Sequence, residues 1–270
     1  MEAAGGRVGF GAMNCPNSSE SSDFLKYCGI PLGAMPEMIS INFAEPVAIF
    51  PLPGVVLLPH TALPLQIFEP RYRQMIQHAL RGSASTGTKP LALASISPIA
   101  KGSQRNPPLR KVVCVAHIVQ HRAHGDGRYD IVLQGLCRAA IERLDEPSGP
   151  RLYREAIVRP IEDPTLVVPG LKRVRDEVKS LLSGLRFQRM QSARAVLEWI
   201  ERKELSHHGA MELVAFALVK DDELRYQILS ESDALERAKL IWTDLHRTDR
   251  FIAKAEEQLG RETPRGVSWN

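Results

Sequence analysis

Prolines interrupt an apolar stretch near the start of the chain, and they restrict the sheet that it can form. Proline has no amide hydrogen to donate to a neighbouring strand, so it lies at strand ends, bulges or edges. Short apolar runs therefore predict short strands in a small curved barrel rather than long strands in a flat sheet. The runs are residues 47–52, 55–58 and 62–67, and the prolines are Pro51, Pro53, Pro59 and Pro64.

The period of the apolar residues changes directly after these runs. From Glu69 onward the spacing becomes that of a helix with one buried face. Pro70 suits the first turn of a helix, and Gly82 suits its end. The sequence therefore predicts an amphipathic helix whose apolar stripe is Tyr72, Met75, Ile76, Ala79 and Leu80.

The ordered motifs of this segment resemble the amino-terminal, substrate-binding domain of the ATP-dependent protease Lon. The matching strings are Phe50-Pro51-Leu52, the run from Val55 to Pro59, Pro64-Leu65, and Phe68-Glu69-Pro70-Arg71-Tyr72. Farther on, Val132 to Arg138 resembles the V-x-G-x-x-R strand of the family. One departure is Cys114, which stands where the family usually has glycine, so the backbone curvature expected there is in question.

More strands are expected downstream, followed by helices after Pro164. Gly125-Asp126-Gly127 predicts a tight hairpin turn, and Gly135 predicts a bulge. Ser206 and the pair Asp233 and Glu236 are candidate helix caps. The expected strands are 91–95, 111–121, 129–133, 139–144 and 152–158, and the expected helices are 171–185, 191–205, 208–219, 224–229 and one from about 233.

The resulting fold class is α+β: a small PUA-like β-barrel with one inserted helix, followed by an α-helical subdomain. We expect a poorly ordered tail over 1–44, a Lon-type barrel over 45–163, the helical subdomain over 164–260 and a flexible end over 261–270. The tail is rich in Gly, Ser and Asn, although a short contact by Phe24, Leu25 and Tyr27 stays open. A translation start at Met35 or Met38 is a further hypothesis, because the family pattern begins just after them.

No G-x-x-x-x-G-K-[ST] phosphate loop occurs in the sequence, and the peptidase signature of Lon has no counterpart. The resemblance therefore implies a free-standing, non-catalytic module that binds unfolded or extended polypeptide, and the sequence leaves open whether a separate protease receives the bound polypeptide. No catalytic, cofactor or metal site is expected. His117 and His121 share a strand face, but no further ligand converges on them in the sequence.

The sequence does not decide which surface of the protein would contact polypeptide. A peptide strand could add to a barrel edge, or apolar side chains could dock between barrel and helices. Phe187 and Met190 lie in the break between two expected helices and are the candidate polypeptide contacts. The alternative for both is a buried helix-helix corner.

Composition places the chain among ordinary globular proteins, with 44% hydrophobic residues and a net charge of +4. No apolar run approaches the length of a membrane span and no secretory signal precedes the first domain, so we expect a cytoplasmic protein with reduced thiols. The mild positive charge decides little, and nucleic acid is an unexpected partner because no stripe of aromatic residues interleaves with the basic ones. An RNA-binding adaptor is nevertheless the alternative function, because PUA-like barrels occur in RNA-binding proteins, and an unrecognised hydrolase is the third. The sequence leaves the oligomeric state open.

Overall fold

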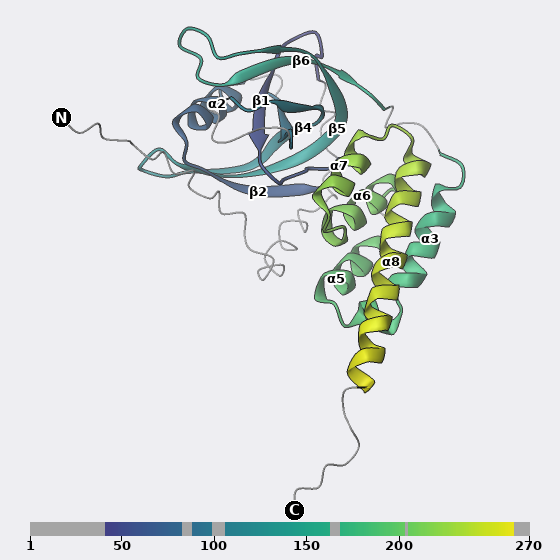
Figure 1. Cartoon of the computed structure of the whole chain (residues 1–270). Helices are drawn as coiled ribbons and strands as arrows, with labels where there is room; N and C mark the ends of the chain where they lie inside the picture. Colours follow the sequence, from purple (N-terminus) through teal and green to yellow (C-terminus); the bar gives the residue numbers. More distant parts are fainter. Residues whose placement is uncertain (1–40, 83–87, 99–105, 163–167, 203–204, 262–270) are drawn as a thin grey trace, which may run out of the picture.

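A computed structural model describes residues 41–82, 88–98, 106–162, 168–202 and 205–261. The strands and one helix form a sheet subdomain, and the remaining helices lie to one side of it as a helical subdomain (Figure 1). The fold is therefore α+β, with strands first and helices after, as the sequence predicts. The strands are β1 (Val47–Leu52), β2 (Ala62–Ile67), β3 (Leu91–Ile96), β4 (Leu109–Ala123), β5 (Tyr129–Asp145) and β6 (Arg154–Pro160).

The strand pairings close into a ring. The order is β2-β5-β4-β3-β1-β6, and β5 pairs with β6 as well, so β1, β3, β4, β5 and β6 make a closed ring of neighbours. Only the pairing of β1 with β3 is parallel. Among the described residues β2 pairs with β5 alone, so its other edge carries no strand.

The prolines occupy the positions that their missing amide hydrogen requires. Pro51 lies past the end of the pairing between β1 and β6, and Pro64 lies in the edge strand β2. One expectation is wrong: residues 55–58 form no strand. Val56, Leu57 and Leu58 are buried instead in an irregular connection, because an apolar run indicates burial but does not supply a pairing partner.

Two cores follow from the alternation of side chains along the strands. One cluster takes every second residue from all five strands of the ring, and it therefore fills the interior of the ring. Its members are Val47, Ile49, Ala92, Ala94, Val113, Val115, Cys137, Ala139, Ala156 and Val158. The residues between them face outward and join a larger core that contains helix α2 (Pro70–Leu80) and the helical subdomain.

The hairpin and bulge expected between β4 and β5 are present. Gly127 has a φ of 79°, a left-handed conformation that glycine tolerates in a turn. The register of β4 against β5 shifts near Gly135. A Cβ added to Gly135 would lie 2.2 Å from the Leu58 carbonyl oxygen and 2.9 Å from Cys114 Sγ. Gly135 therefore allows the Leu58 backbone and the Cys114 side chain to lie close to β5.

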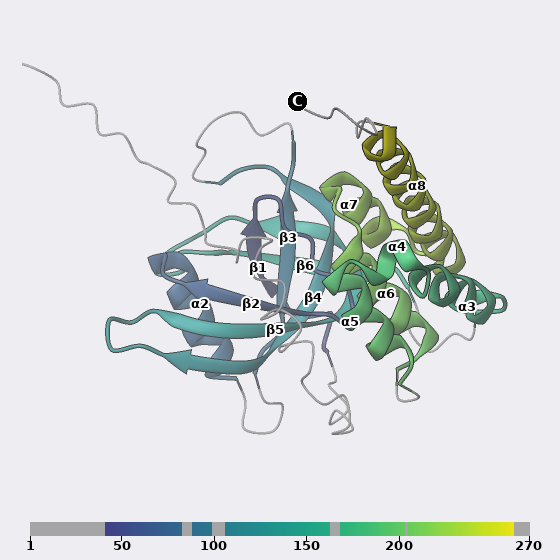
Figure 2. The ribbon, with the colours of Figure 1, turned by 90° about the horizontal axis from the view of Figure 1, so that it is seen from below.

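The helical subdomain surrounds one buried helix. Helix α6 packs against α3, α5, α7 and α8, and α3 and α8 lie side by side (Figure 2). The helix predicted over 171–185 ends at Leu182, and a separate turn of helix follows Gly184. The helix predicted over 191–205 ends at Ile200. The helices are α3 (Leu171–Leu182), α4 (Leu185–Gln188), α5 (Gln191–Ile200), α6 (His207–Leu218), α7 (Asp222–Ser230) and α8 (Ala234–Arg261).

Two of the predicted caps are found. Ser206 accepts a hydrogen bond of 3.0 Å from the Gly209 amide. Asp233 accepts from the amides of Leu235 and Glu236, but its own amide donates to Glu231 rather than to Glu236. Glu231 therefore takes the place of Glu236 as the side chain that accepts the hydrogen bond from the Asp233 amide.

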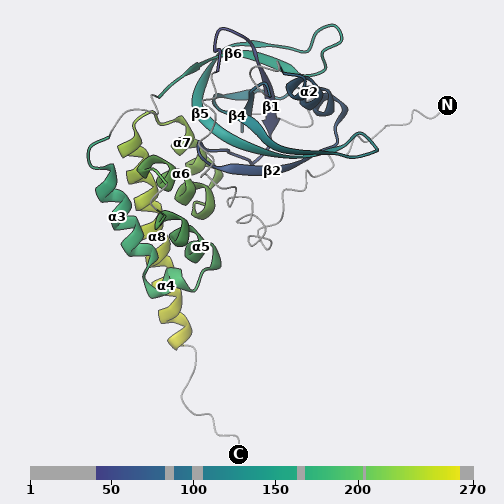
Figure 3. The same ribbon diagram turned by 180° about the vertical axis from the view of Figure 1, so that it is seen from behind.

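The predicted terminal segments lie mostly outside the described residues. Of the expected tail, residues 41–44 are described, and Ile41 and Phe43 pack against the core inside the ring. The far end of α8 points away from the sheet subdomain (Figure 3). None of the described helices combines the length and apolar composition needed to span a membrane.

Candidate functional site

A groove opens in the sheet subdomain between helix α2 and the starts of several strands. Its volume is about 760 Å³, within the range of roughly 300–1,000 Å³ that is common for ligand pockets. Its most buried lining residues are apolar and form the floor: Val47 of β1, Met75 and Ala79 of α2, and Leu91 of β3. These four side chains are at most 3% exposed, so they close the bottom of the groove and a ligand would meet them only at its deepest point.

The end of α2 is held in place on both sides of this groove. Gln74 donates to the Pro150 carbonyl oxygen at 2.8 Å and accepts from the Leu152 amide at 2.8 Å. On the other side, the Lys89 amide donates to the Ala79 carbonyl oxygen at 2.9 Å. The helix is thereby tied to the loop before β6 and to the start of β3, so the groove is preformed.

One wall of the groove is polar and internally bonded. His78 Nδ1 lies 2.8 Å from the Tyr153 hydroxyl. Arg151 lies beside the Tyr153 ring and forms an ion pair of 3.4 Å with Glu155. Burial raises the pKa of the Tyr153 hydroxyl, which therefore stays protonated and able to donate.

The opposite rim carries positive charge without a partner. Arg81 follows the end of α2 and Lys89 precedes β3, and both side chains are exposed. Neither forms an ion pair with another residue of the described ranges. They give this rim a positive potential that an acidic group of a ligand would meet.

His117 of β4 also lines the groove. Its Nδ1 is buried and has no hydrogen-bond partner, and burial lowers the pKa of its ring. The other two histidines of this strand and turn lie elsewhere: His121 is exposed, and His124 Nε2 contacts Asp130 at 2.8 Å. In the part of the chain that the structure describes, no three His, Cys, Asp or Glu residues gather as metal ligands.

The two residues predicted as polypeptide contacts do not belong to this groove. Phe187 of α4 is 1% exposed and lies in the large core, and Met190 is half-buried against that core. Their placement is that of the buried helix-helix corner, which was the alternative. A contact between these residues and polypeptide stays a prediction.

Sequence reasoning missed the groove because its walls come from separate parts of the chain. The residues from 42 to 48, the end of α2, the start of β3 and the loop before β6 meet only in the folded state. One sequence signal does point to it. The apolar stripe of α2 includes Ala79, a small residue that leaves space where a larger side chain would fill the floor.

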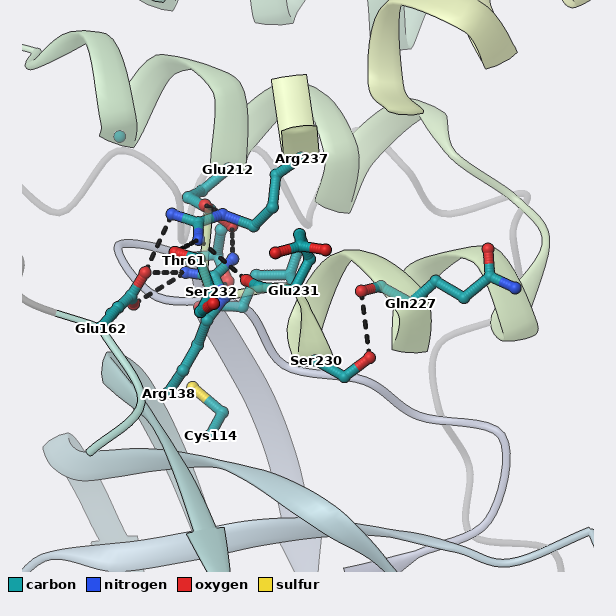
Figure 4. Close-up of polar contacts among 12 residues, drawn as sticks. Thr61, Cys114, Arg138, Glu162, Glu212, Gln227, Ser230, Glu231, Ser232 and Arg237 are labelled. Atoms are coloured by element: carbon teal, nitrogen blue, oxygen red, sulfur yellow. Dashed lines mark hydrogen bonds and ion pairs between the residues drawn. The ribbon is translucent and has the colours of Figure 1, made fainter. Parts of the chain in front are cut away.

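A second cluster of polar residues lies between the two subdomains and is closed to solvent. Arg138 of β5 contacts Glu162 at 2.9 Å and Glu212 of α6 at 2.6 Å. Arg237 of α8 contacts Glu162 at 2.9 Å and Glu212 at 3.3 Å (Figure 4). We call these four residues the ion cluster. Two arginines balance two glutamates, so the cluster has no net charge to offer a ligand.

Burial alone lowers the pKa of Arg138, but the charges of Glu212 and Glu162 outweigh it and raise that pKa. Arg237 also donates to the carbonyl oxygens of Glu231 and Ser232 at 2.9 Å. Each charge therefore has an opposite charge in contact, as burial requires. The ion cluster joins β5, the segment after β6, α6 and α8, and its role is structural.

The described residues thus form an α+β domain in which a closed ring of strands carries a groove beside α2 and an attached helical subdomain. The family model of the "ATP-dependent protease La (LON) substrate-binding domain" matches residues 46–247. This chain belongs to that family. The match includes the sheet subdomain, the helical subdomain as far as the middle of α8, and the lining residues of the groove from Pro46 onward.

The fold is shared with a solved Lon domain. The N-terminal domain of Mycobacterium avium complex Lon protease is 21% identical with a TM-score of 0.55, and the alignment covers 74% of this chain and 98% of that one. A Lon N-terminal domain protein from Xanthomonas campestris is 18% identical with a TM-score of 0.49, over 74% of this chain and 98% of that one. No curated protein matches the sequence.

Proposed function

We propose that this protein is a non-catalytic module that binds unfolded or extended polypeptide in the groove beside α2. The observation that carries the proposal is the apolar floor formed by Val47, Met75, Ala79 and Leu91 in a domain of the Lon substrate-binding family. A single apolar side chain of a peptide would rest on this floor. The polar wall would bond the peptide backbone through the Tyr153 hydroxyl.

The interface between the subdomains offers less room for a peptide. The large core runs without interruption from the strands into the helices, and the ion cluster fills the polar part of the same interface. The free edge of β2 stays a possible place for strand addition, since extended peptides pair with unpaired sheet edges. The groove is the better candidate because it combines apolar and polar contacts.

Further properties of the module are inferred from the amino-acid sequence. We infer a PUA-like barrel and an α-helical subdomain with a boundary near residue 163, and a protein that works in the cytoplasm without a nucleotide-driven motor or peptidase of its own. Delivery of bound polypeptide to a separate protease fits such a module. The mixed charges around the groove, with Glu45 and Glu155 beside Arg81 and Lys89, give RNA binding no support.

The test measures the binding of a labelled, reduced and carboxymethylated polypeptide by fluorescence anisotropy. The variant Ala48→Glu places a carboxylate on the half-buried lining of the groove. We expect its Kd to rise about tenfold, because the charge must lose water when a peptide covers it; tenfold corresponds to about 1.4 kcal/mol.

The matched control is Ala123→Glu, the same change at an exposed strand position outside the groove. Its Kd should equal that of the wild type, and thermal unfolding should show that both variants fold. Equal binding by all three proteins would remove the groove from the proposal. Tight RNA binding that weakens steeply with salt, without polypeptide binding, would favour the adaptor alternative.

A further inference from the structure

The described chain begins at the groove itself. Asn42 and Glu45 line it, and Ile41 and Phe43 are anchored in the core inside the ring. Any residue shortly before Ile41 therefore starts from the rim of the groove. The 40 residues that precede this point are tethered beside the proposed binding surface.

One stretch of that segment has the chemistry of a ligand for the groove. Within a sequence rich in Gly, Ser and Asn, residues 23–27 read Asp-Phe-Leu-Lys-Tyr and are followed by further apolar residues. Phe24 and Leu25 match the apolar floor. Asp23 would meet the rim where Arg81 and Lys89 have no partner among the described residues.

The length of the intervening chain allows this contact. Sixteen residues separate Leu25 from Asn42. A random coil of that length would have a root-mean-square span of roughly 22 Å, which is comparable with the width of a small subdomain. Such a tether gives an effective concentration on the order of 1 mM. A contact with an intrinsic Kd of about 0.1 mM would then be mostly formed.

We propose that residues 23–27 dock in the groove of their own chain and compete there with polypeptide ligands. This inference rests on the proposed function, since it assigns a second occupant to the same surface. With the values above, occupation by the tail raises the apparent Kd for an external polypeptide about tenfold. The protein would thus bind abundant or multivalent polypeptide and reject weak ligands.

The first experiment measures polypeptide affinity with the full chain. The variant Phe24→Ser/Leu25→Ser/Tyr27→Ser should bind the labelled polypeptide about tenfold more tightly than the wild type. The control Val8→Ser/Phe10→Ser/Met13→Ser removes three apolar residues from the same tail and should leave the Kd unchanged. Intact mass measurement confirms that every protein retains residues 1–40.

The second experiment detects the contact without any ligand. In a Cys15→Ser background a nitroxide reagent labels Cys28, because Cys114 and Cys137 are buried and protected from it. The nitroxide broadens the resonances of methyl groups that lie near it. The alanine methyl resonances of Ala48 and Ala79 should broaden more than in the same labelled protein that also carries Phe24→Ser/Leu25→Ser/Tyr27→Ser, because the tether alone already keeps the label near the groove; equal broadening in the two proteins would count against docking. Ala253, on the far part of α8, should not broaden.

The outcomes separate the two proposals. If Ala48 and Ala79 broaden equally in the two labelled proteins and the two serine variants have the same Kd as the wild type, the tail does not occupy the groove and the inference is overturned. If Ala48 and Ala79 broaden more with the unchanged tail but no protein binds polypeptide, docking of the tail is supported and the proposed function fails instead.

Discussion

Gly135 has no Cβ, and this allows the connection between β1 and β2 to pack closely on β5. The Leu58 carbonyl oxygen occupies the place of its Cβ, at 2.2 Å. The Gly135 amide and carbonyl oxygen also bond the Thr61 carbonyl oxygen and the His60 amide, each at 2.9 Å. The irregular connection after residue 58 thus lies directly on β5.

The variant Gly135→Ala should therefore be strongly destabilised, because the clash is with backbone that cannot rotate away. We expect a loss of about 2–4 kcal/mol in the free energy of unfolding, measured with urea. Gly125→Ala is the control, since a Cβ there meets nothing within 4 Å. Similar stabilities for the two variants would contradict the close approach.

His60 connects this site to the pH dependence of stability. Burial lowers the pKa of its ring below the ordinary value of 6.5, and Glu212, Arg138, Glu162 and His208 act on it more weakly. In the unfolded chain the ring gains a proton as the pH falls through about 6.5, while in the folded chain it stays neutral to lower pH. Folding stability therefore decreases as the pH falls below 6.5.

The variant His60→Asn should reduce this loss of stability. Asparagine tolerates the left-handed backbone at this position, where φ is 62°. Free energies of unfolding measured at pH 7.5 and pH 5.5 should differ less in the variant than in the wild type. His117 and His207 also have lowered pKa values, so some pH dependence will remain. An unchanged difference would show that His60 does not contribute.

At the scale of elements, α6 is the helix on which the helical subdomain depends. Most of its residues are buried, and its first turn is satisfied by Ser206. Ser206→Ala should lower the free energy of unfolding by about 0.5–2 kcal/mol, because the Gly209 amide in the first turn of α6 loses its hydrogen-bond acceptor. Ser206→Asp should retain most of the stability.

The control for this change is Ser180→Ala on the exposed face of the last turn of α3, where Ser183 and not Ser180 is the cap residue. It should alter stability by less than about 0.5 kcal/mol. A loss of the same size in both serine variants would mean that the cap at Ser206 adds nothing to the stability of α6.

The elements show what the sequence could and could not predict. Helix α2 and the cap of α6 follow from local chemistry, namely apolar spacing, a proline and a serine, and both are confirmed. Residues 55–58 have equally strong apolar character but form no strand, because pairing depends on distant partners. The groove could not be predicted for the same reason, since Val47, Ala79 and Leu91 meet only through the tertiary fold.

At the scale of the whole molecule, the ion cluster joins the two subdomains. Glu212 contacts both arginines, so Glu212→Gln leaves two buried guanidinium groups with one full negative charge between them. We expect a loss of roughly 3–5 kcal/mol in the free energy of unfolding. Urea unfolding followed by circular dichroism measures it.

The exposed ion pair of Lys172 and Asp176 provides the comparison, because both side chains are more than half exposed. Lys172→Ala should change stability by less than about 1 kcal/mol. If Glu212→Gln had an equally small effect, the ion cluster would be dispensable for holding the subdomains together.

The side chains inside the strand ring have one more consequence. They are alanine, valine, a single isoleucine and a cysteine, and each is at most 9% exposed. A larger side chain introduced at these positions would have to displace its neighbours, so they should tolerate only substitutions of similar volume.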